Sequence, residues 1–327
     1  MKFHVFFFLV LATSLIFAQQ SYKPINEEAS LEVQQLLKDL YELKGKNIIS
    51  GHHNYSHHLS KWHTYVKSNT GKLPLIWGTD LNRYYNEETI NSIVKEAIKR
   101  NSEGYIVTLM WHTGRPQDNP PFNWNNSTQG ELTKEEWKDL ITPGTLLNKK
   151  WESRVDSIAS HLKKLQNANV PILWRPYHEM NGSWFWWGDK KGADGYIKLW
   201  KMMYNRFVNY HKLNNLIWVW NANAPRDKKN DEAYDYDFYF PGVNYVDVLA
   251  ADVYHNDYKQ THHDDLLKLG KGKLIALGEV GEVPSPQILN KQPMWSWFMI
   301  WDKWAETHNT PKQIIDVYNY PRTKSHK

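Results

Sequence analysis

Residues 170–179 read VPILWRPYHE, and this stretch decides the fold, because an apolar run, Val170–Pro176, leads directly into polar side chains. The run is continuous rather than alternating, as expected of a strand that is covered on both faces of a parallel sheet. Seven further runs of this kind occur at residues 47–51, 73–79, 104–111, 216–221, 246–254, 273–278 and 296–301. The sequence therefore predicts eight buried strands.

Helical patterns separate these runs. Residues 87–101, 151–166 and 193–211 each place their apolar side chains on one face of a helix. Strands that alternate with helices eight times predict an α/β fold, a single-domain (β/α)8 TIM barrel. A doubly wound open sheet is the alternative, but its first strand would normally lead into a glycine-rich turn. Only one glycine, Gly51, stands at that place here.

Composition excludes several classes of protein. The 327 residues contain no cysteine, which rules out disulfides, thiolate metal sites and a cysteine nucleophile. The 40 Lys and Arg against 35 Asp and Glu are scattered and form no basic stripe, so we expect no nucleic-acid partner. The 17 tryptophans are an unusually large number and offer planar surfaces for a core or for a flat ligand.

The N-terminal segment has the pattern of an export signal. Lys2 precedes an apolar run from Phe6 to Phe17, and small Ala18 follows. This predicts a secretory signal peptide over residues 1–18 and a catalytic barrel over residues 19–327. The cut site stays open because bulky Ile16 stands three residues before Gln19. We expect a secreted monomer, extracellular or periplasmic, without a membrane partner after removal of the signal, since the apolar run is too short to span a bilayer.

Polar residues collect where the predicted strands end, which is where reactive groups lie in such barrels. Glu179 and Glu279 are the two glutamates that follow apolar strands. A pair of carboxyl groups facing each other is what glycoside hydrolysis requires, one protonated to donate to the leaving oxygen and one ionised to attack. The other candidates at strand ends are His52, His53, Asp80, His112, Arg175, His178, Asn221, Asp252, Tyr254 and Trp301.

Simpler interpretations compete with each of these assignments. A single glutamate at a strand end is usually a surface acid, and His112 alone is more often a core histidine. His53 and His57 have the spacing of helical metal ligands, but no HExxH pattern accompanies them, so we predict no metal and no cofactor. The pair His262-His263 is expected in a solvated loop before a helix. Glu282 is a rival for Glu279, although the apolar strand leads directly to Glu279.

The densest aromatic segment follows the fourth strand, over residues 174–188, WRPYHEMNGSWFWWG. Trp184, Phe185, Trp186 and Trp187 are consecutive and cannot all face a core, because successive side chains point in different directions. We expect Phe185 and one of the tryptophans to form a buried plug. At least one indole is predicted to support the apolar face of a sugar ring.

This segment resembles the signature of glycoside hydrolase family 26, whose members are mostly endo-β-1,4-mannanases. Supporting matches cover most of the chain, at residues 51–52, 111–112, 218–221, 252–254, 276–281 and 321–323. The resemblance implies that Glu179 is the general acid/base and Glu279 the nucleophile. It also implies that Arg175 and Tyr254 hold the nucleophile ionised and aligned. The remaining substrate-binding residues that it implies are Trp111, His112, His178, Trp184, Asp252 and Trp301.

The resemblance implies a retaining hydrolase that cleaves internal β-1,4-mannosidic bonds in mannan, glucomannan and galactomannan by double displacement. A β-1,3-1,4-glucanase, a xylanase and a mannobiose-releasing exo-mannanase remain alternatives on the same barrel. A non-catalytic sugar-binding barrel would have lost one carboxylate, and both are present. The long loop at residues 114–133 is of a kind that sets the distal sugar sites, and Asp302 after Trp301 departs from the pattern, so the preferred chain length stays open.

Overall fold

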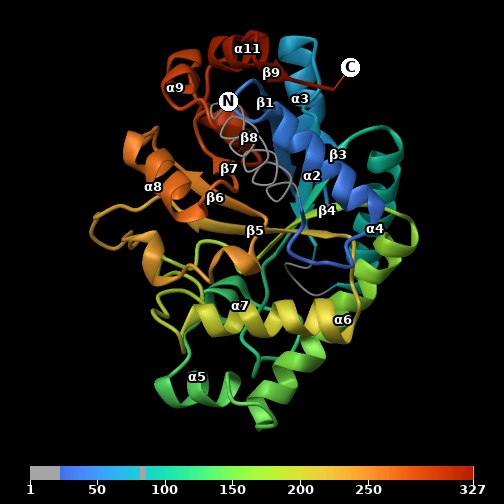
Figure 1. The fold of residues 1–327 in the computed structure, drawn as a ribbon, viewed down its shortest axis with the longest axis vertical. Coiled ribbons are helices and arrows are strands. Elements are labelled where there is room, and N and C mark those ends of the chain that lie inside the picture. Colours follow the sequence, from blue (N-terminus) through green and yellow to red (C-terminus); the bar gives the residue numbers. More distant parts are fainter. Residues whose placement is uncertain (1–22, 82–85, 327) are drawn as a thin grey trace, which may run out of the picture.

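The computed structural model describes residues 23–81 and 86–326, and the predicted signal peptide lies outside these residues. Figure 1 shows the strands at the centre of the molecule and the helices arranged around them. All eight predicted runs contain or overlap a strand. These strands are β1 (Ile48–Asn54), β2 (Ile76–Asp80), β3 (Ile106–Trp111), β4 (Ile172–Pro176), β5 (Leu216–Asn223), β6 (Val248–Val253), β7 (Leu274–Val280) and β8 (Trp295–Ile300).

The eight strands form a closed parallel barrel. Each pairs with its neighbour in chain order, and β1 pairs with both β2 and β8, which closes the ring. A short strand, β9 (Thr323–Lys324), pairs in parallel with the first two residues of β1, Ile48 and Ile49. The predicted (β/α)8 barrel is therefore confirmed, and the open-sheet alternative is wrong.

Helices cover the outside of the barrel in the order of the chain. The predicted helices correspond to α4 (Glu87–Ser102), to α6 (Leu146–Asn167), and to α7 (Tyr196–Asn205) continued by a π-helical turn, η2 (Arg206–Tyr210). The others are α3 (Lys61–Thr70), α5 (Lys134–Leu140), α8 (Gln260–Gly270), α9 (Pro286–Lys291), α10 (Trp304–Thr307) and α11 (Pro311–Asn319). Short turns are η1 (Trp124–Thr128), η3 (Tyr236–Phe238) and η4 (Val243–Tyr245).

The expected solvated loop at His262-His263 is wrong. Both residues lie within α8 and are buried, with only 3% of each exposed. The helix turns them toward the barrel, where the Nε2 atom of His263 accepts a hydrogen bond of 3.3 Å from the backbone N–H of Met294.

A helix that the sequence analysis did not predict, α2 (Leu31–Leu43), closes the N-terminal end of the barrel. Its buried face, with Val33 and Leu37, packs against the inward side chains of the strand beginnings, including Leu173 of β4 and Val219 of β5. The Ser30 hydroxyl caps the helix by accepting from the N–H of Val33. The half of the barrel interior at the N-terminal ends of the strands, called the lower half, is therefore filled with apolar side chains. Polar groups can occupy the interior only at the C-terminal ends of the strands, called the upper end.

Candidate active site

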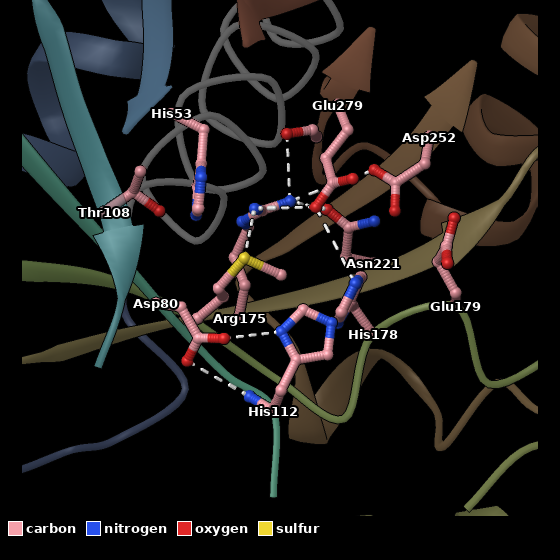
Figure 2. A network of polar contacts seen from close by, with 12 residues as sticks. His53, Asp80, Thr108, His112, Arg175, His178, Glu179, Asn221, Asp252 and Glu279 are labelled. Atoms are coloured by element: carbon pink, nitrogen blue, oxygen red, sulfur yellow. Dashed lines mark hydrogen bonds and ion pairs between the residues drawn. The ribbon is translucent and has the colours of Figure 1, made fainter. Parts of the chain in front are cut away.

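The polar residues of the barrel meet at the C-terminal ends of its strands. Arg175 on β4, Asp252 on β6 and Glu279 on β7 converge there (Figure 2). Each of the three is at most 2% exposed. Charged groups are rarely buried unless they are paired. The contacts of each group therefore define what this cluster can do.

Glu279, the predicted nucleophile, has a donor on each oxygen. Its Oε1 accepts from Nη2 of Arg175 at 3.2 Å, and its Oε2 accepts from the Tyr254 hydroxyl at 2.6 Å. The Nε2 atom of His178 lies 3.7 Å from Oε1. Burial raises the pKa of Glu279, whereas the guanidinium of Arg175, the nearby imidazole of His53 and the hydrogen bond from Tyr254 act in the opposite direction. These partners favour the ionised form in a place where burial disfavours it.

The Arg175 guanidinium is fixed from several sides. Nη1 donates to Oδ1 of Asn221 at 2.7 Å and to the carbonyl of Gly278 at 2.9 Å, and Nη2 also faces the sulfur of Met110. Residue 278 must be glycine, since a Cβ there would come within 1.7 Å of Oδ1 of Asn221. The guanidinium consequently holds one orientation toward Glu279.

Glu179, the predicted acid/base, has a different environment. It is 8% exposed and stands apart from the guanidinium in Figure 2. Nδ2 of Asn223 donates to its Oε1, and the indole N–H of Trp184 donates to its Oε2 at 2.8 Å. Burial and the negative charge of Glu279 raise the pKa of Glu179 to about 7, against the lowering effect of the two donors and of Arg226. At neutral pH this carboxyl group can both give and take a proton.

The backbone after β4 aims Glu179 at the site. Glu179 has a positive φ of 53°, and Tyr177 has one of 47°, so two non-glycine residues adopt the left-handed conformation within one turn. Such residues persist only where the surroundings impose them. Here the N–H of Glu179 donates to the carbonyl of Asn221 at 2.8 Å, which ties the turn to the end of β5.

Two histidines of the predicted binding set lie side by side. Nδ1 of His112 is 2.6 Å from Oδ2 of Asp80, and the backbone N–H of His112 donates to the other oxygen. The ring of His112 meets that of His178 edge-on, with centroids 4.5 Å apart. The carboxylate of Asp80 thereby fixes the orientation of one ring, which in turn packs against the other.

Asp252 completes the cluster beside Glu279. Burial and then the negative charges of Glu279 and Glu179 raise its pKa well above the ordinary range, in opposition to Arg175. One ligand atom each of His178, Asp252 and Glu279 lie within 4.8 Å of one another, close enough to share a cation. The guanidinium of Arg175 already supplies a positive charge there, 3.9 Å from Oδ1 of Asp252. We therefore interpret this group as a polar cluster arranged around Arg175.

The aromatic residues divide into a buried plug and two partly exposed rings. Phe185, Trp186 and Trp187 are buried, so the predicted plug of Phe185 and one tryptophan is present and contains a second tryptophan that was not predicted to belong to it. Trp184 remains partly exposed, and its indole packs on Gly182, where a Cβ would come within 2.1 Å of Cη2. Trp301 is also partly exposed and stacks on the ring of His53, with centroids 4.2 Å apart.

The placement of Trp111 in the substrate-binding set is wrong. Its side chain is fully buried in the layer between the strands and the outer helices, where it packs against Tyr177. Side chains alternate along a strand, and on β3 it is Met110 that faces the interior and contacts Arg175. Trp111 therefore supports the site from behind the barrel wall.

Glu282 does not join the carboxyl cluster. Its Oε2 accepts from the backbone N–H of Asn256 at 3.1 Å, and its carbonyl accepts from the hydroxyl of Tyr258 at 2.5 Å. The structure thus places Glu279, and not its rival, beside Arg175.

Two residues near the site were missed by sequence reasoning. Asn223 lies at the end of β5, and Arg226 follows in the next loop and contacts it. The signal for Asn223 was its spacing of two from Asn221, since residues two apart on a strand share a face. Nothing in the local sequence marked Arg226 among the scattered charges.

The fold and the site together define a class of enzyme. A parallel barrel presents two buried carboxyl groups, one after β4 beside the end of β5 and one at the end of β7. The carboxyl group on β7 lies beside a guanidinium, and the one after β4 has a pKa of about 7. Two carboxyl groups in opposite electrostatic environments are typical of glycoside hydrolases. The sequence pattern of glycosyl hydrolase family 26 matches residues 25–325, and the chain belongs to this family. The resemblance found in the motifs is thereby confirmed.

Two curated relatives of this chain are named as mannan endo-1,4-beta-mannosidases. A mannan endo-1,4-beta-mannosidase from Thermothelomyces thermophilus is 36% identical over 308 residues, which cover 90% of this chain and 60% of the relative. The mannan endo-1,4-beta-mannosidase A and B from Caldalkalibacillus mannanilyticus is 30% identical over 347 residues, which cover 96% of this chain and 65% of the relative. The chain therefore spans less than two thirds of the length of either relative.

Solved structures agree with the family assignment. GH26A from Muricauda sp. has 55% sequence identity and a TM-score of 0.90, over 92% of this chain and 98% of that chain. The beta-mannanase from a symbiotic protist of the termite Reticulitermes speratus, solved with gluco-manno-oligosaccharide, has 28% identity and a TM-score of 0.81, over 93% and 96% of the two chains. These similarities support the barrel and its strand order.

Proposed function

We propose that this glycoside hydrolase cleaves internal β-1,4-mannosidic bonds in mannan, glucomannan and galactomannan, with retention of configuration at the anomeric carbon. The observation that carries the proposal is the contrast between Glu279, beside Arg175, and Glu179, whose pKa is about 7. A retaining mechanism requires this division between an ionised nucleophile and a proton donor. The choice of mannan is supported by the names of the relatives.

In the first step, a carboxylate oxygen of Glu279 forms a bond to the anomeric carbon while the bond from that carbon to the leaving oxygen breaks. Glu179 transfers its proton to the leaving oxygen, so the departing sugar chain leaves as a neutral alcohol. Arg175 and the Tyr254 hydroxyl hold Glu279 in place with one donor on each oxygen. The fixed guanidinium limits the motion that the carboxylate must make to reach the carbon.

In the second step, water attacks the anomeric carbon and the ester bond to Glu279 breaks. Glu179, now ionised, accepts the proton of that water and is ready for another cycle. The two donors on Glu179, from Asn223 and Trp184, stabilise this ionised form. A pKa near neutrality allows the same group to serve in both steps.

The remaining residues bind the sugar. We assign His112, His178 and Asp252 to hydroxyl groups of the reacting unit, because their polar side chains lie around Glu279 at the end of the barrel. Trp184 beside Glu179 would support the leaving-group sugar, and Trp301 the sugar on the other side of the bond. Both rings retain exposed surface on which a pyranose could stack.

The N-terminal region carries a proposal of its own. We infer that residues 1–18 direct secretion and that the barrel acts as a monomer on polysaccharide outside the cytoplasm. Over residues 23–81 and 86–326, none of the helices combines the length and the apolar character that a bilayer-spanning segment requires. N-terminal sequencing of protein recovered outside the cell tests the inference, and an uncleaved Met1 in that fraction contradicts it. Size-exclusion chromatography tests the monomer.

A panel of polysaccharides tests the activity. We expect a ladder of oligosaccharides from mannan, glucomannan and galactomannan, with the β-anomer observed first by NMR. Release of mannobiose alone would replace endo action with exo action. Activity confined to mixed-linkage glucan or xylan would overturn the choice of substrate, and absence of hydrolysis on every polymer would overturn the enzyme itself.

A further inference from the structure

Arg226, in the loop after β5, is a charged side chain that the mechanism above does not use. Its guanidinium is held by Asp231: Nε donates to the carbonyl at 2.9 Å and to Oδ2 at 3.0 Å, while Nη2 donates to Oδ1 at 2.5 Å. The backbone of Arg226 also forms a pair of hydrogen bonds with that of Ala233. The side chain is only 16% exposed. These contacts fix the position and the orientation of the guanidinium.

The remaining arm of the guanidinium points to the acid/base. Nη1 of Arg226 donates to Oδ1 of Asn223, and Nδ2 of Asn223 donates to Oε1 of Glu179. A guanidinium has donors only, so the amide of Asn223 must turn its oxygen to Arg226 and its nitrogen to Glu179. Asn181 fixes the backbone of Asn223 from both sides, with hydrogen bonds of 2.8 Å to its N–H and to its carbonyl.

Arg226 also contacts the second donor to Glu179. Its guanidinium lies 5.4 Å from the centroid of the Trp184 ring, and the indole N–H of Trp184 donates to Oε2 of Glu179 at 2.8 Å. One side chain therefore touches both groups that hydrogen-bond to the carboxyl. Both are obligate donors in this arrangement, and donors stabilise the ionised form of a carboxyl group.

We propose that Arg226 is a positioning residue for Glu179, which acts through Asn223 and Trp184 to hold the carboxyl in place and to favour its ionised form. The inference rests on the proposed role of Glu179 as acid/base. Without Arg226, the amide of Asn223 could reverse and present its oxygen to the carboxyl. The pKa of Glu179 would then be too high for its carboxyl group to act as the base of the second step.

The direction of the pH effect follows from the charges that face Glu179. Glu279 on β7 and Asp252 on β6 are negative when ionised, and Tyr254 after β6 is a neutral phenol whose pKa is raised well above its usual value by burial and these carboxylates. Arg226 is a positive group that acts on Glu179 and lowers its pKa. Its removal therefore raises the pKa of Glu179, and the basic limb of the kcat/KM profile moves to higher pH.

The test compares Arg226→Ala with Arg206→Ala, a matched control at the outer surface. Arg206 has the same kind of environment, a two-point pair with Asp156 and a ring, Tyr210, 4.0 Å from the guanidinium. We expect Arg226→Ala to move the basic limb upward by about one unit. At pH 7 it should slow turnover of an activated aryl glycoside by about 5-fold, because the ionised fraction of Glu179 falls from about one half to about one tenth. Arg226→Lys should restore part of the shift, and Arg206→Ala should leave the profile unchanged.

A second background separates the relay from a merely structural role. In an Asn223→Ala variant, the additional effect of Arg226→Ala should be smaller than in the wild type, because the path through the amide is gone. Equal shifts in both backgrounds, or the same profile for Arg226→Ala and Arg206→Ala, would overturn the inference. Failure of the proposed function is distinguishable, because Glu179→Ala would then retain activity on substrates with poor leaving groups.

Discussion

The two ends of the barrel interior are equally buried but chemically opposite. On β4, Leu173 and Arg175 are two residues apart and both point inward, yet Leu173 belongs to the apolar cluster beneath and Arg175 to the polar cluster above. The lower end is closed by α2 and needs no partner beyond close packing. The upper end places a guanidinium, carboxyl groups and histidines where water is largely excluded.

This difference shows how one backbone separates stability from chemistry. Burial of apolar side chains stabilises the fold in proportion to the area removed from water. Burial of charges costs free energy that their mutual attraction repays only with good geometry. The lower half therefore provides the stability that permits the upper half to hold ionisable groups in unfavourable surroundings.

The largest expected effect comes from removing the nucleophile. Glu279→Ala should lower kcat on mannan by about 10⁴-fold or more, as is typical when a catalytic nucleophile is removed. Thermal unfolding should show a fold that is retained, because Arg175 keeps its contacts to Asn221 and to the Gly278 carbonyl. Steady-state kinetics measures the loss. Glu282→Ala serves as the control, and a comparable loss of kcat in that variant would contradict the assignment of Glu279 as the nucleophile.

A substitution at the lower end should reduce the stability of the fold and leave the turnover rate nearly unchanged. Leu173→Ala removes a fully buried side chain and should lower the free energy of unfolding by about 2–5 kcal/mol. Denaturant unfolding measures the effect, with Leu146→Ala as the control, because Leu146 is 72% exposed. At a temperature where the variant is folded, kcat should stay near that of the wild type. A large loss of kcat without a loss of stability would break the comparison between the two ends.

The smallest effect concerns the pH dependence of stability. The pKa of Glu179 is about 7 in the folded protein, above its ordinary value of 4.5, so the folded state binds this proton more tightly. The resulting stabilisation is complete below pH 4.5 and disappears as the pH rises through 7. Glu179→Gln removes this dependence. Between pH 4 and pH 8, the free energy of unfolding of the variant should therefore rise by about 1–3 kcal/mol relative to that of the wild type.

Denaturant unfolding at several pH values checks this expectation. A difference between Glu179→Gln and wild type that stays constant across the range would mean that the carboxyl group is not held in its protonated form by burial. The activity profile gives an independent reading, since the basic limb of kcat/KM should report the same group near pH 7.

Much of the fold was predictable from the sequence because the strands of a closed parallel barrel are buried on both sides. Continuous apolar runs identified all eight, and the polar residues that end them marked Glu179 and Glu279. The error at Trp111 has a physical reason. A residue at the end of a strand can face the barrel interior or the outer helices, and its position in the run does not say which.

The position of Glu279 shows what local sequence leaves undetermined. Leu277 and Val280 of β7 pair with Phe298 and Ile300 of β8, so three steps on one strand oppose two on the other. The pairing with β6 shifts at the same place, between Ala251 and Asp252. Simple alternation would direct residues 278 and 279 to opposite faces of the sheet. The extra residue allows both Gly278 and Glu279 to meet Arg175.

The sequence by itself determined the barrel, the family resemblance and the two carboxyl groups, because these depend on apolar periodicity and on residues within one segment. The tertiary structure decided the orientation of Glu279, the closure of the lower end by α2, and the contacts of Asn223 and Arg226 with the acid/base. These features join residues that are far apart in the chain or that depend on a shift in strand pairing. Local patterns carry no information about such distances, and the packing of the complete barrel sets them.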